Sequence, residues 1–141
     1  MKIDGTRSND RATEVVLDYY AAFNRGDWEA MLVLLDEGVV HDLNQAARET
    51  GQAAFARFLA RMEASYREQL HDIVVMTSPD GNRAAAEYVV HGTYLASDPG
   101  LPEARGQSYV LPGGAFFEIH DGRIHRVTNY YNLEDWIAQV R

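Results

Sequence analysis

Asp42 raises the first chemical question in this sequence, because it lies in the apolar stretch VVHDLN at residues 39–44. An acid inside a short apolar run is costly to bury unless a partner satisfies it. A carboxylate whose pKa is modestly raised can take a proton from one carbon and return it to another. The residues alone also allow a second interpretation, in which Asp42 ends a strand and Asp-Leu-Asn-Gln forms a turn.

The five histidines do not form an evident metal site. His41 adjoins Asp42, so on a strand the two side chains point to opposite faces, and we expect His41 at the surface or in a dimer contact. His91 lies in the middle of a predicted strand and could line either face. No pair has the spacing of a helical zinc site, so we predict no metal. The other histidines are expected at strand ends or exposed positions: His71, His120 and His125.

The composition indicates one globular domain and disfavours several functions. The chain has 141 residues, of which 46% are hydrophobic and 24% charged, which is enough for a real core. A formal charge of −8 disfavours binding to nucleic acids and to anionic membranes. The absence of cysteine excludes disulfides and thiolate chemistry. No apolar stretch approaches a membrane span and MKIDGTRSND lacks a signal-peptide core, so we expect a cytoplasmic protein with a flexible tail over residues 1–10.

Apolar residues recur at helical spacing in four segments. The first begins near Asp10, which can cap a helix, and its apolar face extends to Phe23. Asp27 can cap a second helix. The helical period returns over residues 52–66, and Asn132 can cap a fourth, short helix at the C-terminal end.

The strands are expected mainly in the second half of the chain, where SPDGN and HDGR are tight-turn signals. NQAARETG and SDPGLPEARG are expected as loops. Pro112-Gly113-Gly114 interrupts one strand, so we predict a bend there; no helix follows these glycines, so they do not form a phosphate loop, and no cofactor motif is visible. The predicted strands are 39–43, 70–77, 83–95, 107–120 and 124–131.

This order of elements predicts an α+β fold with a mostly antiparallel sheet. Three amphipathic helices laid across a curved sheet would enclose a cone. We therefore predict a single domain over residues 11–141, in which a cone-shaped sheet wraps around the N-terminal helices and a short helix ends the chain.

Three segments carry a family resemblance, namely YYAAFNRGDWEAMLVLL, VVHDLNQAARETG and FFEIHDGRIHRVTNYYNLEDW. Occurring in this order over about residues 11–140, they make the chain resemble the nuclear transport factor 2-like superfamily, and within it the SnoaL-like and ketosteroid isomerase-related proteins. The resemblance implies a cystatin-like cone with a pocket between the helices and the concave sheet. The superfamily includes isomerases, cyclases, epoxide hydrolases, dehydratases and non-catalytic members, so the fold alone does not determine the function.

The resemblance also implies roles for two residues. Asp42 lies nine residues before Gly51, as the catalytic Asp of ketosteroid isomerase lies before a helix-opening glycine, which implies a general base in the pocket. Tyr19 lies five residues before Asn24, matching a tyrosine that donates to the developing enolate. This division of roles is the established one in ketosteroid isomerase, and the resemblance alone carries it to this chain. Tyr19 is equally compatible with an ordinary core position.

One part of that enzyme has no counterpart here. Its second, protonated acid corresponds to a position at or near Ala115, and the nearest acid is Glu118. A replacement donor could come from any of four residues, among which the sequence does not choose: Tyr88, Tyr109, Asn129 and Tyr130. Three further residues are expected mainly in the core, with some in an apolar pocket wall: Trp28, Phe58 and Met62.

The leading functional hypothesis is an isomerase or polyketide-cyclase type of enzyme. It would act on a small hydrophobic ketone-like metabolite by proton abstraction and return, with Asp42 as base. A water-activating site built from Glu118 and Arg126 is a lower-ranked alternative. A third alternative is a non-catalytic module of the same fold that binds a small molecule or dimerises. By resemblance we also expect a homodimer through the outer sheet face, where Val89 and His91 alternate.

Overall fold

The structure is a computed structural model that describes residues 8–141, and it confirms the α+β class. Within those residues the helices are α1 (Ser8–Asn24), α2 (Trp28–Val33), α3 (Gln52–Ser65) and α4 (Leu133–Val140). The strands are β1 (Leu35–Asp42), β2 (Glu49–Thr50), β3 (Tyr66–Thr77), β4 (Arg83–Tyr94), β5 (Ser108–His120) and β6 (Arg123–Tyr131).

Two predicted helix caps are present and a third is not. The side chain of Asp27 accepts a hydrogen bond from the backbone N–H of Ala30 at 3.1 Å, which satisfies a free donor at the start of α2. Asn132 caps α4 in the same way, through the backbone N–H of Asp135 at 3.0 Å. Asp10 lies inside the first turn of α1 rather than before it, so its predicted capping role is wrong.

The sheet has the strand order β2-β1-β6-β5-β4-β3. Only the pairing of β1 with β6 is parallel, and the other four pairings are antiparallel. Three differences from the sequence prediction exceed a shift of one residue at a boundary. β1 begins four residues early at Leu35, β3 begins at Tyr66 directly after α3, and the short β2 lies in the segment expected as a loop.

The turn between β5 and β6 explains their close pairing. Asp121 and Gly122 have φ values of 52° and 72°. Positive φ at both central residues is the type I′ geometry, whose twist matches that of a hairpin. The expected interruption at Pro112-Gly113-Gly114 is not seen, because β5 continues through all three residues and pairs there with β4 without a register shift.

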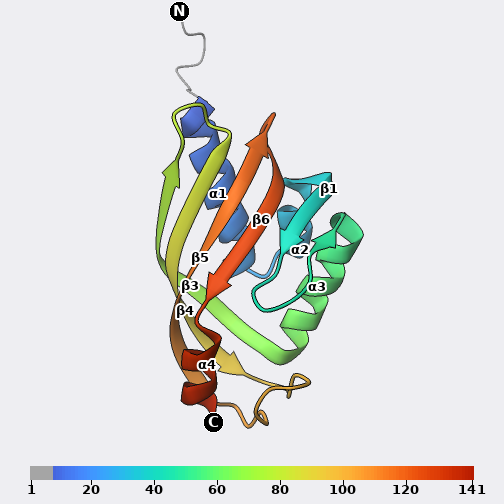
Figure 1. Cartoon of the computed structure of the whole chain (residues 1–141), viewed down its shortest axis with the longest axis vertical. Helices are drawn as coiled ribbons and strands as arrows, with labels where there is room; N and C mark the ends of the chain where they lie inside the picture. Colours follow the sequence, from blue (N-terminus) through green and yellow to red (C-terminus); the bar gives the residue numbers. More distant parts are fainter. Residues whose placement is uncertain (1–7) are drawn as a thin grey trace, which may run out of the picture.

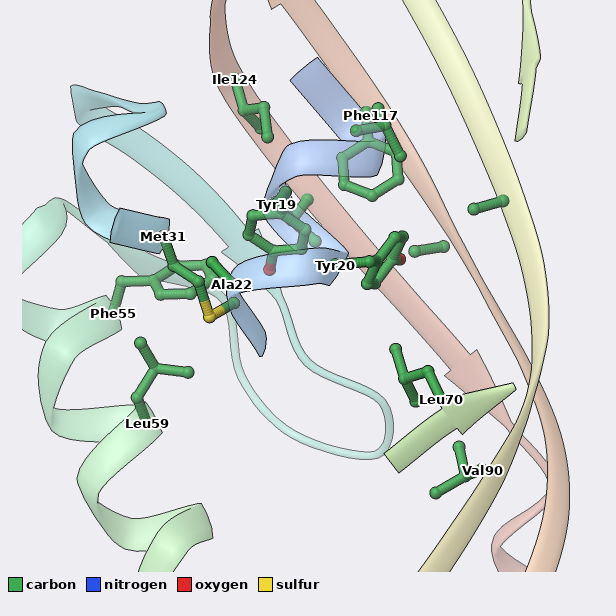
Figure 2. Packing of buried hydrophobic residues seen from close by; sticks show 14 of the residues in the cluster. Tyr19, Tyr20, Ala22, Met31, Phe55, Leu59, Leu70, Val90, Phe117 and Ile124 are labelled. Carbon is green, nitrogen blue, oxygen red and sulfur yellow. The ribbon is translucent and has the colours of Figure 1, made fainter. Parts of the chain in front are cut away.

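α1 and α3 cover the concave face of the curved sheet, and α4 closes one end of it (Figure 1). Figure 2 shows Tyr19 from α1, Phe55 from α3 and Leu70 from β3 directed toward a common interior. At the far end, the ring of Trp136 on α4 packs edge-on against Tyr94. Helices and sheet therefore share one hydrophobic core.

The predicted tail over residues 1–10 is only partly within the described chain. Residues 1–7 lie outside it, and Ser8–Asp10 belong to α1. None of the helices in the described part of the chain combines the length and the apolar character that a bilayer span requires.

Candidate active site

A cavity of about 820 Å³ lies between the helices and the concave face of the sheet. Most of the residues that line it are aromatic or aliphatic, and the others include three arginines, three acids, His41 and several amides. A cavity of this size can hold a molecule of several fused rings. Six of the residues singled out from the sequence line it: Tyr19, Trp28, Phe58, Met62, Tyr88 and Asn129.

Glu68 is one of three acids that line this cavity, with Glu63 and Asp98, and the sequence analysis singled out none of them. It lies on β3 between Tyr66 and Leu70, whose side chains also face inward. Burial raises the pKa of the Glu68 carboxyl, because desolvation disfavours the charged form. The Tyr109 hydroxyl opposes this by donating a hydrogen bond to Glu68 Oε2 at 2.5 Å.

The Tyr109–Glu68 bond depends on a glycine between the two residues. Glu68 on β3 pairs with Gly92 on β4, and Gly92 pairs with Tyr109 on β5, so the three form one row across the sheet. A Cβ at Gly92 would lie 2.2 Å from Tyr109 Cζ. The ring therefore lies over the bare glycine backbone to reach Glu68.

A second row repeats this arrangement four residues earlier on β4. Tyr88 on β4 pairs with Gly113 on β5, which pairs with Tyr131 on β6. A Cβ at Gly113 would lie 2.9 Å from Tyr88 Cε1, so this glycine makes room for the aromatic ring. Gly113 of the PGG segment therefore allows aromatic packing in the cavity wall.

Five tyrosines line the cavity, and three of them are potential hydrogen-bond donors to a ligand: Tyr19, Tyr20 and Tyr88. Burial raises the pKa of Tyr19 and of Tyr20 above their usual value, and it raises the pKa of Tyr88 to about 12. The charge of Glu68 adds to the shift at Tyr88, so these two groups lie within electrostatic range. All three hydroxyls keep their protons at neutral pH.

His41 also lines the cavity, contrary to the expected surface position. It is 1% exposed, and its ring stacks on Phe55 and meets Phe58 edge-on, with centroid distances of 4.5 and 4.6 Å. Its Nε2 lies 2.9 Å from the amide nitrogen of Asn129. Burial lowers the pKa of His41 to about 4, so the imidazole is neutral at physiological pH.

Asp42 faces the opposite side of the sheet, so the expected placement in the cavity beside Tyr19 is wrong. Its carboxylate accepts hydrogen bonds from Arg48 Nε at 2.5 Å and Nη2 at 3.0 Å, and from Thr128 Oγ1 at 2.8 Å. These bonds, the one from Arg48 first, lower the pKa of Asp42. The side chain is 25% exposed. Side chains alternate along β1, and because Val39 and His41 are the buried pair, Asp42 must face outward.

The outward face around Asp42 carries an ion network. Arg126 binds both Glu118 and Thr128, and Thr128 in turn donates to Asp42. These groups border a shallow polar depression of about 310 Å³ on the convex side of the sheet. Tyr130 borders it too and is 55% exposed, so its predicted place in the inner cavity is wrong.

The structure also places three other residues that the sequence analysis discussed. Tyr109 is buried behind Glu68 and is not part of the cavity lining, so it acts on a cavity group and does not face a ligand. His91 lies exposed on the convex face. Ala115, the position of the missing acid, is buried directly opposite Asn129 in the neighbouring strand.

Residues 16–127 match the model of the SnoaL-like domain family. A crystal structure of a proposed polyketide cyclase from Xanthomonas campestris is 65% identical, with a TM-score of 0.92 over 95% of this chain and 99% of that one. Another from Pseudomonas putida is 58% identical, with a TM-score of 0.90 over 97% and 100%. A nuclear transport factor 2-like protein from Burkholderia xenovorans has the same fold at 14% identity, with a TM-score of 0.74 over 96% and 100%. No curated protein matches the chain.

Proposed function

The chain belongs to the SnoaL-like domain family and has the nuclear transport factor 2-like fold, and from this premise we propose that it is an isomerase- or cyclase-type enzyme. It moves a proton on a small hydrophobic ketone-like metabolite held in the inner cavity. Glu68 is the general base. The observation that carries the proposal is a carboxylate in an aromatic cavity whose pKa is raised by burial.

Glu68 suits this role because burial raises the pKa of its carboxyl and a hydrogen bond holds one of its oxygens in place. A carboxylate of ordinary pKa is a weak base toward a carbon acid, and desolvation makes it a better proton acceptor. The hydrogen bond from Tyr109 holds one oxygen, Oε2, in a fixed position. The other oxygen has no hydrogen-bond partner among the described residues, and it is the one proposed to receive the proton.

The phenols supply the matching electrostatic stabilisation. When Glu68 takes a proton from the carbon beside a carbonyl group, the electron pair moves onto the carbonyl oxygen. A fixed donor in a water-poor site stabilises that charge. Tyr88 is proposed as the donor near Glu68, with Tyr19 as a second donor further along the cavity. Glu68 then returns the proton to another carbon, or the enolate closes a ring, and no cofactor takes part.

Asp42 is not the proposed base. Its carboxylate binds Arg48 and Thr128 on the convex face, and these bonds make it a weaker proton acceptor. Glu118 and Arg126 lie on the same outer face, so the water-activating alternative would need a different site from the inner cavity.

Solvent deuterium exchange tests the proposal without knowledge of the natural substrate. Wild-type protein and Glu68→Gln are incubated in D2O with bicyclic ketones such as 2-tetralone, and exchange at the α-carbon is followed by NMR. We expect catalysed exchange by the wild type and a loss of about 100-fold or more in the variant. Binding of the ketones without exchange by the wild type would favour the non-catalytic binding module instead.

A further inference from the structure

His41 and Asn129 form a polar pair in the cavity wall that the proposed proton transfer does not use. His41 lies on β1 and Asn129 on β6, the strand parallel to it. The His41 ring is fixed on two sides by Phe55 and Phe58 of α3. A buried histidine that is held this firmly beside a partly buried amide calls for an explanation.

The contact between the two side chains determines the imidazole tautomer. An amide nitrogen can only donate, so at 2.9 Å Asn129 Nδ2 donates and His41 Nε2 accepts. The neutral ring must then carry its proton on Nδ1. Nδ1 is buried and has no partner among the described residues, so the contact with Asn129 is the one hydrogen bond that the ring makes there.

The other side of the Asn129 amide is open. Asn129 lines the cavity, and within residues 8–141 its Oδ1 and second N–H have no hydrogen-bond partner. Across the sheet it pairs with Ala115, and Ala115 pairs with Ala86, so small side chains stand beside it in the row.

This row is separate from the one that holds Glu68. The two rows cross β4 at Ala86 and Gly92. These positions are six residues apart, which corresponds to about 20 Å of extended chain. The curvature of the sheet makes the distance through space shorter. A ligand that reaches both rows must be elongated.

We propose that Asn129 is a ligand-binding residue that hydrogen-bonds an oxygen substituent of the ligand remote from the carbon at Glu68, and that His41 is its positioning residue. The ligand class is an elongated, multi-ring ketone with a second hydroxyl or carbonyl group toward its other end. This inference rests on the proposed function only in that the ligand occupies the same cavity.

NMR of the side-chain nitrogens tests the positioning role directly. In the wild type at pH 7, ¹⁵N spectra are expected to show His41 protonated on Nδ1. Asn129→Asp preserves the shape but replaces the donor with a carboxylate oxygen, so the proton of His41 is expected to move to Nε2. The same tautomer in both proteins would show that Asn129 does not hydrogen-bond the ring, and that result, or an Nε2–H tautomer in the wild type, would overturn the proposal.

Binding of two naphthols tests the ligand contact. The probes are 2-naphthol and 2,6-dihydroxynaphthalene, which differ by one hydroxyl group. We expect the wild type to bind the dihydroxy probe about tenfold more tightly, and Asn129→Leu to lose that preference. Equal preference in the wild type and Asn129→Leu would overturn the proposal.

The Glu68→Gln variant separates this inference from the proposed function. It is expected to keep the Asn129-dependent preference even though α-proton exchange is lost. If exchange survives in Glu68→Gln while the preference still depends on Asn129, the base assignment fails and the binding subsite stands. If exchange is lost in Glu68→Gln but the preference does not depend on Asn129, the subsite proposal fails and the base assignment stands.

Discussion

The Tyr109 hydroxyl reaches the Glu68 carboxylate across an intervening strand, at 2.5 Å from Oε2. The two residues lie on β5 and β3, and only the absence of a side chain at Gly92 on β4 allows the contact. The sheet thus holds one cavity carboxylate in place through a hydrogen bond that crosses a strand at a glycine.

Removing the Tyr109 hydroxyl should make Glu68 a stronger base. In Tyr109→Phe the ring still covers Gly92, but the bond that lowers the pKa of Glu68 is lost, so that pKa should rise further. The measurement is a ¹³C NMR titration of the Glu68 carboxyl carbon. Tyr66→Phe is a matched control, because its hydroxyl donates to Asp98 instead. An unchanged titration in Tyr109→Phe would show that the hydrogen bond does not tune Glu68.

Filling the space at Gly92 should destabilise the fold. The added methyl group of Gly92→Ala would meet the Tyr109 ring, and overpacking of this kind costs about 1–3 kcal/mol. Chemical denaturation measures the change in the free energy of unfolding. Gly38→Ala is the control, since its nearest neighbour would be an Asp36 carboxylate oxygen at an ordinary 3.5 Å. Equal effects of the two substitutions would contradict the close approach of the ring.

His41 should make the protein less stable in mild acid. Its pKa is lowered to about 4 in the folded chain, from an ordinary 6.5, so the unfolded chain binds more protons between these values. The contribution of His41 is therefore present above about pH 6.5 and is lost as the pH falls toward 4, by up to about 3 kcal/mol. Unfolding free energies of the wild type and His41→Phe are compared at pH 7 and pH 4.5. Parallel losses in both proteins would show that His41 titrates normally.

The convex face of the sheet should pair with a second copy of the chain. Phe116 and Tyr130 stack edge-on there, with ring centroids 5.7 Å apart, and Val110 is exposed on the same face. Light scattering is expected to find a dimer in the wild type and a monomer in Phe116→Lys. Val33→Lys is the control, because Val33 is 70% exposed on α2, away from the sheet. A monomeric wild type, or equal effects of the two lysines, would contradict this expectation.

The sequence predicted the architecture well because its signals are local. Helical spacing, the caps at Asp27 and Asn132 and the HDGR turn each act within a few residues, and each is present in the structure. The alternation of Tyr66, Glu68 and Leu70 is also a local strand signal. It lies directly after the helical pattern of α3, which obscures the start of β3 and with it the inward-facing acid.

The site was harder to predict because it depends on which face of a strand is buried. A shift of one residue exchanges the two faces, and His41 occupies the inner position that was expected for Asp42. The partners of both residues include groups distant in sequence. Arg48 and Thr128 hold Asp42 outside, and Asn129 holds His41 inside, and no local pattern encodes these contacts.

The central claim is that the working carboxylate is Glu68 in the cavity and not Asp42 on the convex face. The most direct measurement compares Glu68→Gln and Asp42→Asn in the deuterium-exchange assay with one ketone that the wild type processes. We expect Glu68→Gln to lose about 100-fold or more of the exchange rate while Asp42→Asn stays within a few-fold of the wild type. Full activity of Glu68→Gln together with an inactive, folded Asp42→Asn would contradict the account.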